Sequence, residues 1–343
     1  MKTPCSKEAR SLFFLVSTLV GLIVVLDAAV KLAWALEPPD PTELETLRAR
    51  GELDSRIDFV NQLGNHKVDS YLLRRAINKA GRAALRAQGK TEEEINRIAP
   101  EFAPPPGRQG MPTTGNVRIL ALLIEFQDYT HTHGQADIHN NLFGAGDPAR
   151  APYESLATYY DRASYQQLDL GSGNTLGWYK TTYNRSGVTT TDTGRETLIK
   201  EALNHFDAQG HDFSQYDNNN DGVIDYLVVI WTGPDTGWGT FWWGYQTRFK
   251  DSSYTLDGVN LGKYSWQWET RPVGGAFTPL VVIHETGHAL GLPDYYDYSS
   301  SFGPDGGVGG LDMMDANKGD HNCFSKWVVD WLSPIVVAGG SQT

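Results

Sequence analysis

The chain has 343 residues, of which 40% are hydrophobic and 20% charged, and its formal net charge is −12. The apolar content supports a sizeable core and excludes an intrinsically disordered chain, and the length suits a leader plus one large domain or two modest ones. The acidic balance, with no basic patch, argues against nucleic acid and anionic membrane surfaces as partners.

The first 35 residues have the pattern of a secretory signal peptide. Basic residues precede an apolar run at 12–26, and Ala33-Trp34-Ala35 comes after it as a small-x-small cleavage site. The run is shorter than the ~20 residues of a spanning helix, which favours cleavage after about Ala35 over a retained anchor. We therefore expect a secreted, extracellular protein without stable membrane insertion after cleavage.

Residues 36–112 differ in composition from residues 113–343. Charged residues alternate with Leu, Ile and Ala at helical spacing, and Thr91-Glu92-Glu93-Glu94 predicts a capping box that opens a short helix. A Pro-rich stretch at 104–112 predicts a stiff, exposed linker. The composition leaves two interpretations open, namely a propeptide and an ordinary N-terminal helical extension.

Residues 113–343 combine predicted strands with predicted helices. Apolar runs at 117–126 and 226–231 predict buried strands, and 153–162 predicts a helix. This mixture indicates a domain of the α/β or α+β class. The aromatic run 238–245 either lines a cleft or packs in the core, and core packing is the simpler interpretation.

An Asp- and Asn-rich loop precedes the second predicted strand. Its oxygen-bearing residues fall at positions one, three, five, seven and nine of a calcium loop: Asp217, Asn219, Asp221, Val223 through its carbonyl, and Asp225. Gly222 supplies the sharp turn at position six. Position twelve is Val228 instead of a glutamate, so the loop is not a full EF-hand. The sequence predicts a Ca²⁺ site, with a metal-free turn as the alternative.

The segment His284-Glu285-Thr286-Gly287-His288 has the pattern H-E-x-x-H. Histidines four residues apart lie on one face of a helix, one turn apart, within reach of a single ion. Zinc binds imidazole nitrogen and lowers the pKa of a bound water towards ~7, and Glu285 is placed to take the proton of that water. The alternative is a surface helix with two solvated histidines.

The third zinc ligand is predicted from the residues that end this helix. Gly291 permits the positive φ of a helix C-terminus, and Pro293 prevents the helix from resuming. Such a turn would bring Asp294 back under the metal, where a carboxylate oxygen is a good zinc ligand.

The sequence also gives expectations for the surroundings of several residues outside this motif. His321 is predicted to lie in a surface loop, with support of an oxyanion as the alternative, and His131, His133 and His139 are predicted to be solvated. Cys323 is expected to be a small buried hydrophobic residue, as free cysteines usually are. With two cysteines in the whole chain, a disulfide framework and a thiolate zinc site are excluded.

The segment HETGHALGLPDYYD resembles the immune inhibitor A family of secreted bacterial metallopeptidases, which carry H-E-x-x-H-x-x-G-x-x-D. The opening strand at 117–128, the Tyr- and Trp-containing region at 155–179, the Asp-rich loop at 217–230 and the stretch 311–331 are also similar to that family. The resemblance covers about residues 113–334. The chain departs from the family in ending at Thr343, where members commonly continue into C-terminal β-rich domains, and in its unusually aromatic run at 238–245.

The resemblance implies a metzincin-like α+β fold with a twisted sheet, an active-site helix and a Met-turn, preceded by a helical propeptide. It implies zinc ligation by His284, His288 and Asp294, with Glu285 as the base, and it places Met314, or else Met313, beneath the metal as a soft floor. The domains expected are a signal peptide at 1–35, a propeptide and linker at 36–112, and a zinc peptidase domain at 113–343.

The sequence thus predicts a secreted zinc endopeptidase made as a zymogen, acting on protein or peptide substrates and inhibited by its own propeptide. No cysteine lies between Leu36 and Pro112, so zinc cannot be blocked there by a thiolate; a carboxylate, His66 or steric cover remain. One alternative is a calcium-stabilised binding or adhesion module with a non-catalytic peptidase fold. Another is a zinc hydrolase for non-peptide substrates.

Overall fold

The computed structural model describes residues 41–105, 110–150, 154–297, 307–317 and 319–335, all within one compact unit that spans 35–343. The predicted signal peptide and part of the predicted linker lie outside the described residues. Among the described residues, no helix combines the length and apolar character needed to span a bilayer.

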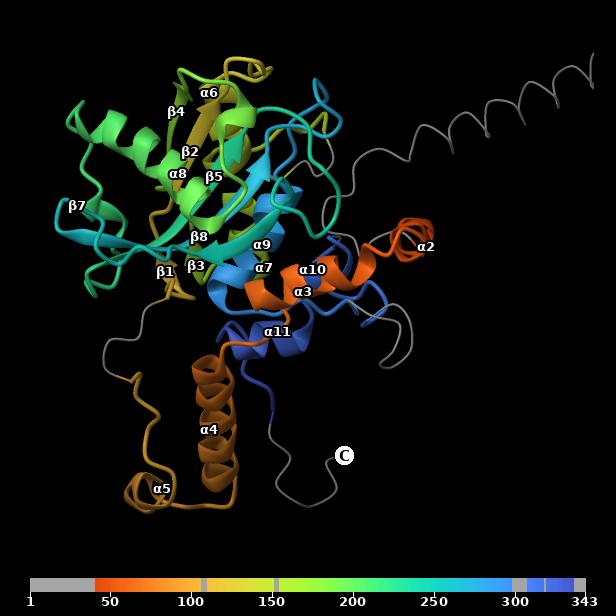
Figure 1. The fold of residues 1–343 in the computed structure, drawn as a ribbon. Coiled ribbons are helices and arrows are strands. Elements are labelled where there is room, and N and C mark those ends of the chain that lie inside the picture. The colour runs from red at the N-terminus through yellow and green to blue at the C-terminus, as the bar shows by residue number, and fades with distance from the viewer. Residues whose placement is uncertain (1–40, 106–109, 151–153, 298–306, 318, 336–343) are drawn as a thin grey trace, which may run out of the picture. The chain divides into compact units, whose positions relative to one another are not determined.

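Figure 1 labels most of the helices and strands that follow. The α-helices are α2 (Pro41–Ala49), α3 (Leu53–Leu63), α4 (Ser70–Ala87), α5 (Glu92–Ile98), α6 (Gln135–Phe143), α7 (Leu156–Ala163), α8 (Asp192–Asp207), α9 (Leu280–Leu290), α10 (Met313–Ala316) and α11 (Cys323–Val328). The strands are β1 (Gly115–Asn116), β2 (Leu120–Glu125), β3 (Leu168–Asp169), β4 (Asn174–Lys180), β5 (Val223–Trp231), β6 (Tyr245–Arg248), β7 (Thr255–Leu256) and β8 (Val259–Trp268). Two 3₁₀ turns, η1 (Arg185–Gly187) and η2 (Ser214–Tyr216), complete the set.

The main sheet has the strand order β4-β2-β5-β8-β6. The first four strands are parallel, whereas β6 runs antiparallel to β8 and forms one edge of the sheet. Every residue of β2 and β5 is buried, as expected for parallel strands that are covered on both faces. The unbroken apolar runs therefore predicted the two central strands correctly.

The two faces of the sheet support two separate cores. Alternate residues of β2 point to opposite faces, so Leu122 joins one core and Leu123 the other. The first core includes α8 and most of the buried tryptophans, and the second includes α6, α7 and most of α9. The mixed α and β architecture with a preceding helical region is thereby confirmed.

Helices α2–α5, named the N-terminal helical region, contact both cores. Leu47 and Val60 belong to the first core, and Leu72 and Ala76 on α4 are also buried. Thr91 and Glu94 form the predicted capping box at the start of α5. The region is thus packed onto the sheet domain through its apolar side chains, as a helical segment with no core of its own requires.

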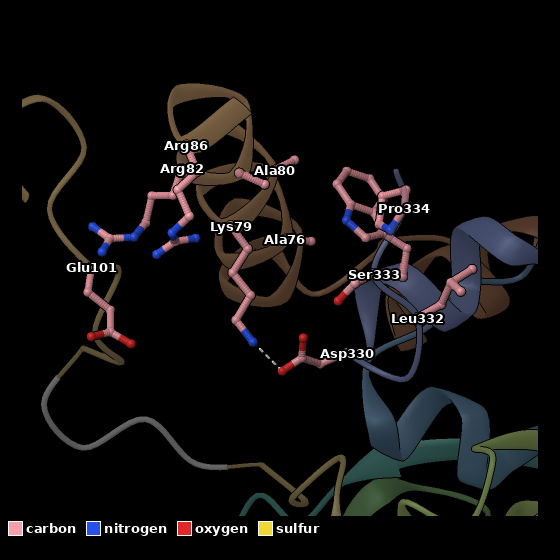
Figure 2. A pocket seen from close by; sticks show the side chains of 12 residues that line it. Ala76, Lys79, Ala80, Arg82, Arg86, Glu101, Asp330, Leu332, Ser333 and Pro334 are labelled. Atoms are coloured by element: carbon pink, nitrogen blue, oxygen red, sulfur yellow. Dashed lines mark hydrogen bonds and ion pairs between the residues drawn. The ribbon is translucent and has the colours of Figure 1, made fainter. Parts of the chain in front are cut away.

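A cavity of about 420 Å³ lies between α4 and the segment after α11. Figure 2 shows Lys79 of α4 in an ion pair with Asp330 across it. The cationic side chains Arg82 and Arg86 on its wall are paired with Glu92 at the start of α5. The cavity therefore marks where α4 is anchored, and its cations already have partners.

Candidate metal centre

Helix α9 carries both histidines of the predicted metal motif. The side chains of His284 and His288 are buried, and their Nε2 atoms lie 3.1 Å apart. The fourfold spacing produces this proximity, because residues i and i+4 stack on one face of a helix.

A turn at Gly291 brings the third residue to the same place. Gly291 has φ 103° and ends α9 in the left-handed conformation that the sequence predicted. Asp294 comes next, with Oδ1 2.9 Å from Nε2 of His284 and 3.3 Å from Nε2 of His288. Among the described residues, this is the one place where three His, Cys, Asp or Glu ligand atoms gather within 4.8 Å of one another.

Backbone carbonyls fix which ring nitrogens carry protons. Nδ1 of His284 lies 3.2 Å from the carbonyl of Met313, and Nδ1 of His288 lies 2.8 Å from that of Leu292. A carbonyl oxygen only accepts, so each Nδ1 is the donor and each Nε2 presents a lone pair. Two lone pairs and one carboxylate oxygen then face one another, an arrangement that needs a cation between them.

The pKa values of the three clustered side chains also indicate that they lack a shared positive charge. Burial lowers the pKa of His284, but the hydrogen bond and charge of Asp294 outweigh it and raise the pKa to about 9. For His288, burial prevails and the pKa is lowered. The Asp294 carboxyl is buried too, yet the two imidazoles hold its pKa below the usual range. The three side chains are therefore strongly coupled, and a cation shared among them would offset the cost of burying them together.

Zinc fits the spacing of the three ligand atoms. Tetrahedral ligands at ~2.0–2.1 Å from one ion lie roughly 3.3–3.4 Å apart. The three atoms here are 2.9, 3.1 and 3.3 Å apart. The carbonyl partners of the two histidines supply the outer hydrogen bonds that zinc-binding imidazoles usually have.

Glu285 lies next to this cluster without belonging to it. Its carboxylate is fully buried and neither oxygen makes a well-formed hydrogen bond with the described residues. Burial raises the pKa of Glu285 to about 8, and the charge of His284 and a nearby backbone N–H of Gln246 oppose that shift. A dication at the cluster would also oppose this rise through its charge.

Side chains from the C-terminal segment form the floor beneath α9. Met314 contacts Gly287, the residue just before His288, so closely that a Cβ on Gly287 would collide with its sulfur. His321 is 3% exposed and its Nδ1 lies 3.3 Å from Oδ1 of Asp312, so its predicted position in a surface loop is wrong. The burial of His321 results from packing beneath α9, which the local sequence does not contain.

Other predictions about isolated residues also need correction. Cys323 is exposed as the first residue of α11 instead of buried, because Ser325 and Lys326 face inwards there. His131 and His133 are bound by the buried carboxylates of Glu125 and Glu269, so they are not simply solvated. His139 contacts Thr175 through Nδ1.

Tyr296 is a site residue that no motif in the sequence singled out. Its hydroxyl hydrogen-bonds the Asp294 carboxylate, and burial together with that charge raises its pKa well above the ordinary value. The phenol therefore donates to the third ligand and orients it. Its position two residues after Asp294, inside the HETGHALGLPDYYD segment, was the available signal.

The N-terminal helical region covers the cluster through the loop between α3 and α4. The backbone carbonyl of Asn65 accepts a hydrogen bond from the N–H of Asp294 at 2.8 Å, and its side-chain amide donates to the carbonyl of Gln246 on β6 at 3.2 Å. The N–H of Asp69 donates to the carbonyl of Gly291 at 2.9 Å. His66 lies close enough for the Asp294 charge to act on its pKa, which burial nevertheless lowers.

The predicted calcium loop is a tight turn leading into β5. The carboxylate of Asp217 accepts the backbone N–H groups of Asp221 and Gly222 at 3.0 and 2.8 Å. Asp225 is buried within β5, and burial raises its pKa to about 7. Asn219 and Val223 lie in the same turn. The loop is thus held by its own side chains, and its Ca²⁺ ligands stay a prediction.

We expect Ca²⁺ to raise the thermal unfolding temperature of the wild-type chain by several degrees. Saturating a site at 100 Kd adds about 2.7 kcal/mol of stability. The substitution Asp221→Ala removes one predicted ligand and should abolish the rise, whereas Asp207→Ala, on the exposed end of α8, should keep it. Differential scanning calorimetry with and without Ca²⁺ measures this, and equal shifts in wild type and Asp221→Ala would remove the site.

Comparisons with known proteins find distant relatives, one of which is named a metalloprotease. No protein-family model matches the chain. It is 28% identical over 234 residues to the pre-pro-metalloprotease PrtV of Vibrio cholerae, which covers 52% of this chain and 25% of PrtV. It is 25% identical over 238 residues to immune inhibitor A of Bacillus thuringiensis subsp. alesti, which covers 53% of this chain and 34% of that protein. The similarity supports a metallopeptidase family and spans about a quarter to a third of the relatives' length.

Proposed function

We propose that this chain is a secreted, zinc-dependent endopeptidase made as a zymogen. The observation that carries the proposal is the convergence of His284 Nε2, His288 Nε2 and Asp294 Oδ1 beside the buried carboxylate of Glu285. The distant metalloprotease relatives support the same class. A signal peptide at 1–35 and a metzincin-like peptidase fold with Met314 as the residue of the Met-turn belong to this proposal.

In catalysis, three of the chain's residues would bind the metal and a fourth, Glu285, would transfer protons. Zinc held by the three ligands would polarise a scissile carbonyl and acidify a water molecule. Glu285 accepts a proton from that water at its carboxylate and later gives the proton to the leaving amine. The carbonyls of Met313 and Leu292 keep both imidazoles in the tautomer that presents Nε2.

The edge strand β6 provides the binding surface for an extended substrate. It pairs with β8 on one side, and the carbonyl of Gln246 is bound by the side-chain amide of Asn65 on the other. A peptide chain could add there as a further strand through main-chain hydrogen bonds. While the N-terminal helical region is still attached to the chain, its loop at 64–69 occupies this edge of β6.

Steric cover by the N-terminal helical region is the form of latency that the contacts favour. With that region in place, the side chains of His284 and Glu285 have no exposed surface and His288 is 4% exposed. A substrate could not reach them. The contacts of Asn65 and Asp69 with Asp294, Gln246 and Gly291 are the ones that removal of the region would break.

We expect proteolysis to appear when the linker is cut and to disappear on chelation. A site-specific protease sequence placed within 104–112 allows the cut to be made at will. The uncut chain should be at least tenfold less active on casein than the cut chain, and a zinc chelator should abolish the activity of the cut chain until zinc is restored. Equal caseinolysis before and after the cut would contradict the latency.

A binding or adhesion module is the second candidate. It would keep the fold and the calcium loop without hydrolysis. The complete set of His284, Glu285, His288 and Asp294 in one buried cluster argues against it. Elemental analysis separates the candidates, since a chain without stoichiometric zinc would favour the binding module.

A further inference from the structure

An aromatic depression lies beside the third ligand of the metal centre. Trp238, Trp243, Tyr245 and Tyr296 line it, together with Asp294. All four aromatic side chains are at least nine-tenths buried. These residues come from the 238–245 run and from the segment just after α9, so the depression borders both the edge strand β6 and the metal ligands.

Helix α3 of the N-terminal helical region fills this depression. Phe59, Val60 and Leu63 lie against its walls, and only about 10 Å³ of free space is left. The ring of Phe59 meets that of Tyr245 edge-to-face with centroids 5.5 Å apart. Three apolar side chains on one helix therefore occupy a site next to the catalytic residues.

Polar contacts hold the helix at the rim of the depression. The guanidinium of Arg56 donates to the carbonyl of Trp238 at 2.7 Å. Gly239 permits this approach, since a Cβ there would lie 3.0 Å from Cβ of Arg56. The aromatic run is thus shaped to receive a chain segment, and the segment it receives here is part of the region that must leave for activity.

Two of the walls, Trp243 and Tyr245, are also held by contacts from the sheet side. Trp243 packs on Trp268 with ring centroids 5.0 Å apart and lies under the guanidinium of Arg271 at 4.7 Å. The Tyr245 hydroxyl accepts a hydrogen bond from the buried Arg195 at 2.7 Å. Removing α3 would therefore leave these two walls with their contacts on the sheet side.

Two other residues of the aromatic run pack in the core and do not line the depression. Trp242 packs against Trp231 and Trp266, and Phe241 packs against Trp266, in the core of the sheet, with ring centroids 4.9–5.6 Å apart. The expectation that the run packs in the core therefore holds for these two residues. Trp238 and Trp243 differ from them, because both line the depression together with residues of α3.

We propose that the depression is a substrate subsite for bulky apolar side chains, such as leucine or phenylalanine, close to the scissile bond. The inference rests on the proposed peptidase function and deepens it. In the uncut chain the apolar face of α3 stands in for the substrate. A flat aromatic wall favours large apolar groups because their burial removes the most surface from water.

The test uses the full chain with a cleavable linker, cut and loaded with zinc. Quenched fluorescent peptides differ at one position at a time, with glycine or leucine there. We expect the cut wild type to cleave the leucine peptides at least tenfold faster in kcat/KM at one position next to the scissile bond, since even one methylene group in an apolar pocket is worth roughly 10- to 200-fold. Trp243→Ala should bring this ratio down about tenfold, and Trp243→Phe should restore most of it.

A matched control and a second readout distinguish loss of the subsite from a general loss of folding or activity. Trp178→Ala removes an indole that stacks on His131, outside the depression, and should keep the wild-type ratio. In the cut Glu285→Gln chain, an uncleaved leucine peptide should bind with at least tenfold lower Kd than its glycine counterpart, and adding Trp243→Ala should remove that difference. Binding is measured by fluorescence anisotropy, which needs no turnover.

The outcomes separate the two proposals. A cut wild type that cleaves leucine and glycine peptides equally well overturns the subsite and leaves the peptidase standing. A Trp243→Ala chain that keeps the wild-type ratio also overturns the subsite. A zinc-loaded, cut wild type that cleaves none of the peptides and no casein overturns both.

Discussion

Glu285→Gln in the cut, zinc-loaded chain is expected to reduce kcat/KM on casein-derived peptides by about 10²- to 10⁴-fold. Glutamine keeps the size and the position of the side chain but cannot accept a proton. Glu285 is buried beside the His284, His288 and Asp294 cluster and is not one of the three clustered ligands, so zinc should remain bound at one equivalent. Peptide hydrolysis and elemental analysis on the same sample measure both quantities.

Glu154→Gln serves as the matched control for this change. Glu154 pairs with Arg162 of α7, outside the metal centre, and loses the same single charge on substitution. We expect wild-type hydrolysis from it. If Glu285→Gln hydrolyses peptides at the wild-type rate with zinc bound, Glu285 is not the base and the mechanism has to be abandoned.

Asp294→Ala is expected to cost the cut chain its zinc. The carboxylate supplies one of three protein ligands, and its loss should weaken zinc binding by more than the roughly 10- to 100-fold that results from loss of an outer-shell partner. Without the carboxylate, the two imidazoles, whose Nε2 atoms lie 3.1 Å apart, lose the charge that offsets most of their burial, which disfavours a cation between them. Peptide hydrolysis at low zinc should fall in parallel.

Zinc affinity is measured by competition with a chromogenic chelator, and circular dichroism checks that the variant is folded. Asp161→Ala, on the exposed side of α7, is the matched control and should bind zinc as the wild type does. A folded Asp294→Ala chain with unchanged zinc affinity would assign the third ligand to another residue. Tyr296 and the covering loop, which both contact Asp294, would then be the first places to look.

The central strands and the active-site helix could be predicted because their signals are local. Unbroken apolar runs mark β2 and β5, since parallel strands buried on both faces have no polar side. The spacing of His284 and His288 places both rings on one face of α9 by helix geometry alone. Gly291 has the left-handed φ of 103° that ends the helix, which only a residue without a Cβ adopts at little cost.

Contacts between distant parts of the chain decided the rest. Asn65 and Gln246 are 181 residues apart in sequence, and their hydrogen bond places the loop at 64–69 over the metal centre. The burial of His321 against Asp312 beneath α9 and the contact of Phe59 on α3 with Tyr245 have the same origin. Periodicity and motif spacing describe a segment and its own neighbours. They do not specify which surface of the sheet a helix from another segment will cover.

The sequence by itself therefore determined the mixed α and β fold class and the gathering of His284, His288 and Asp294, because helix pitch, a helix-ending turn and apolar periodicity act over a few residues. The tertiary structure alone decided that the N-terminal helical region covers the metal centre and fills an aromatic depression beside it. Both features arise when apolar faces from separate segments are buried together, and the free energy of that burial depends on the partner surface as much as on the segment.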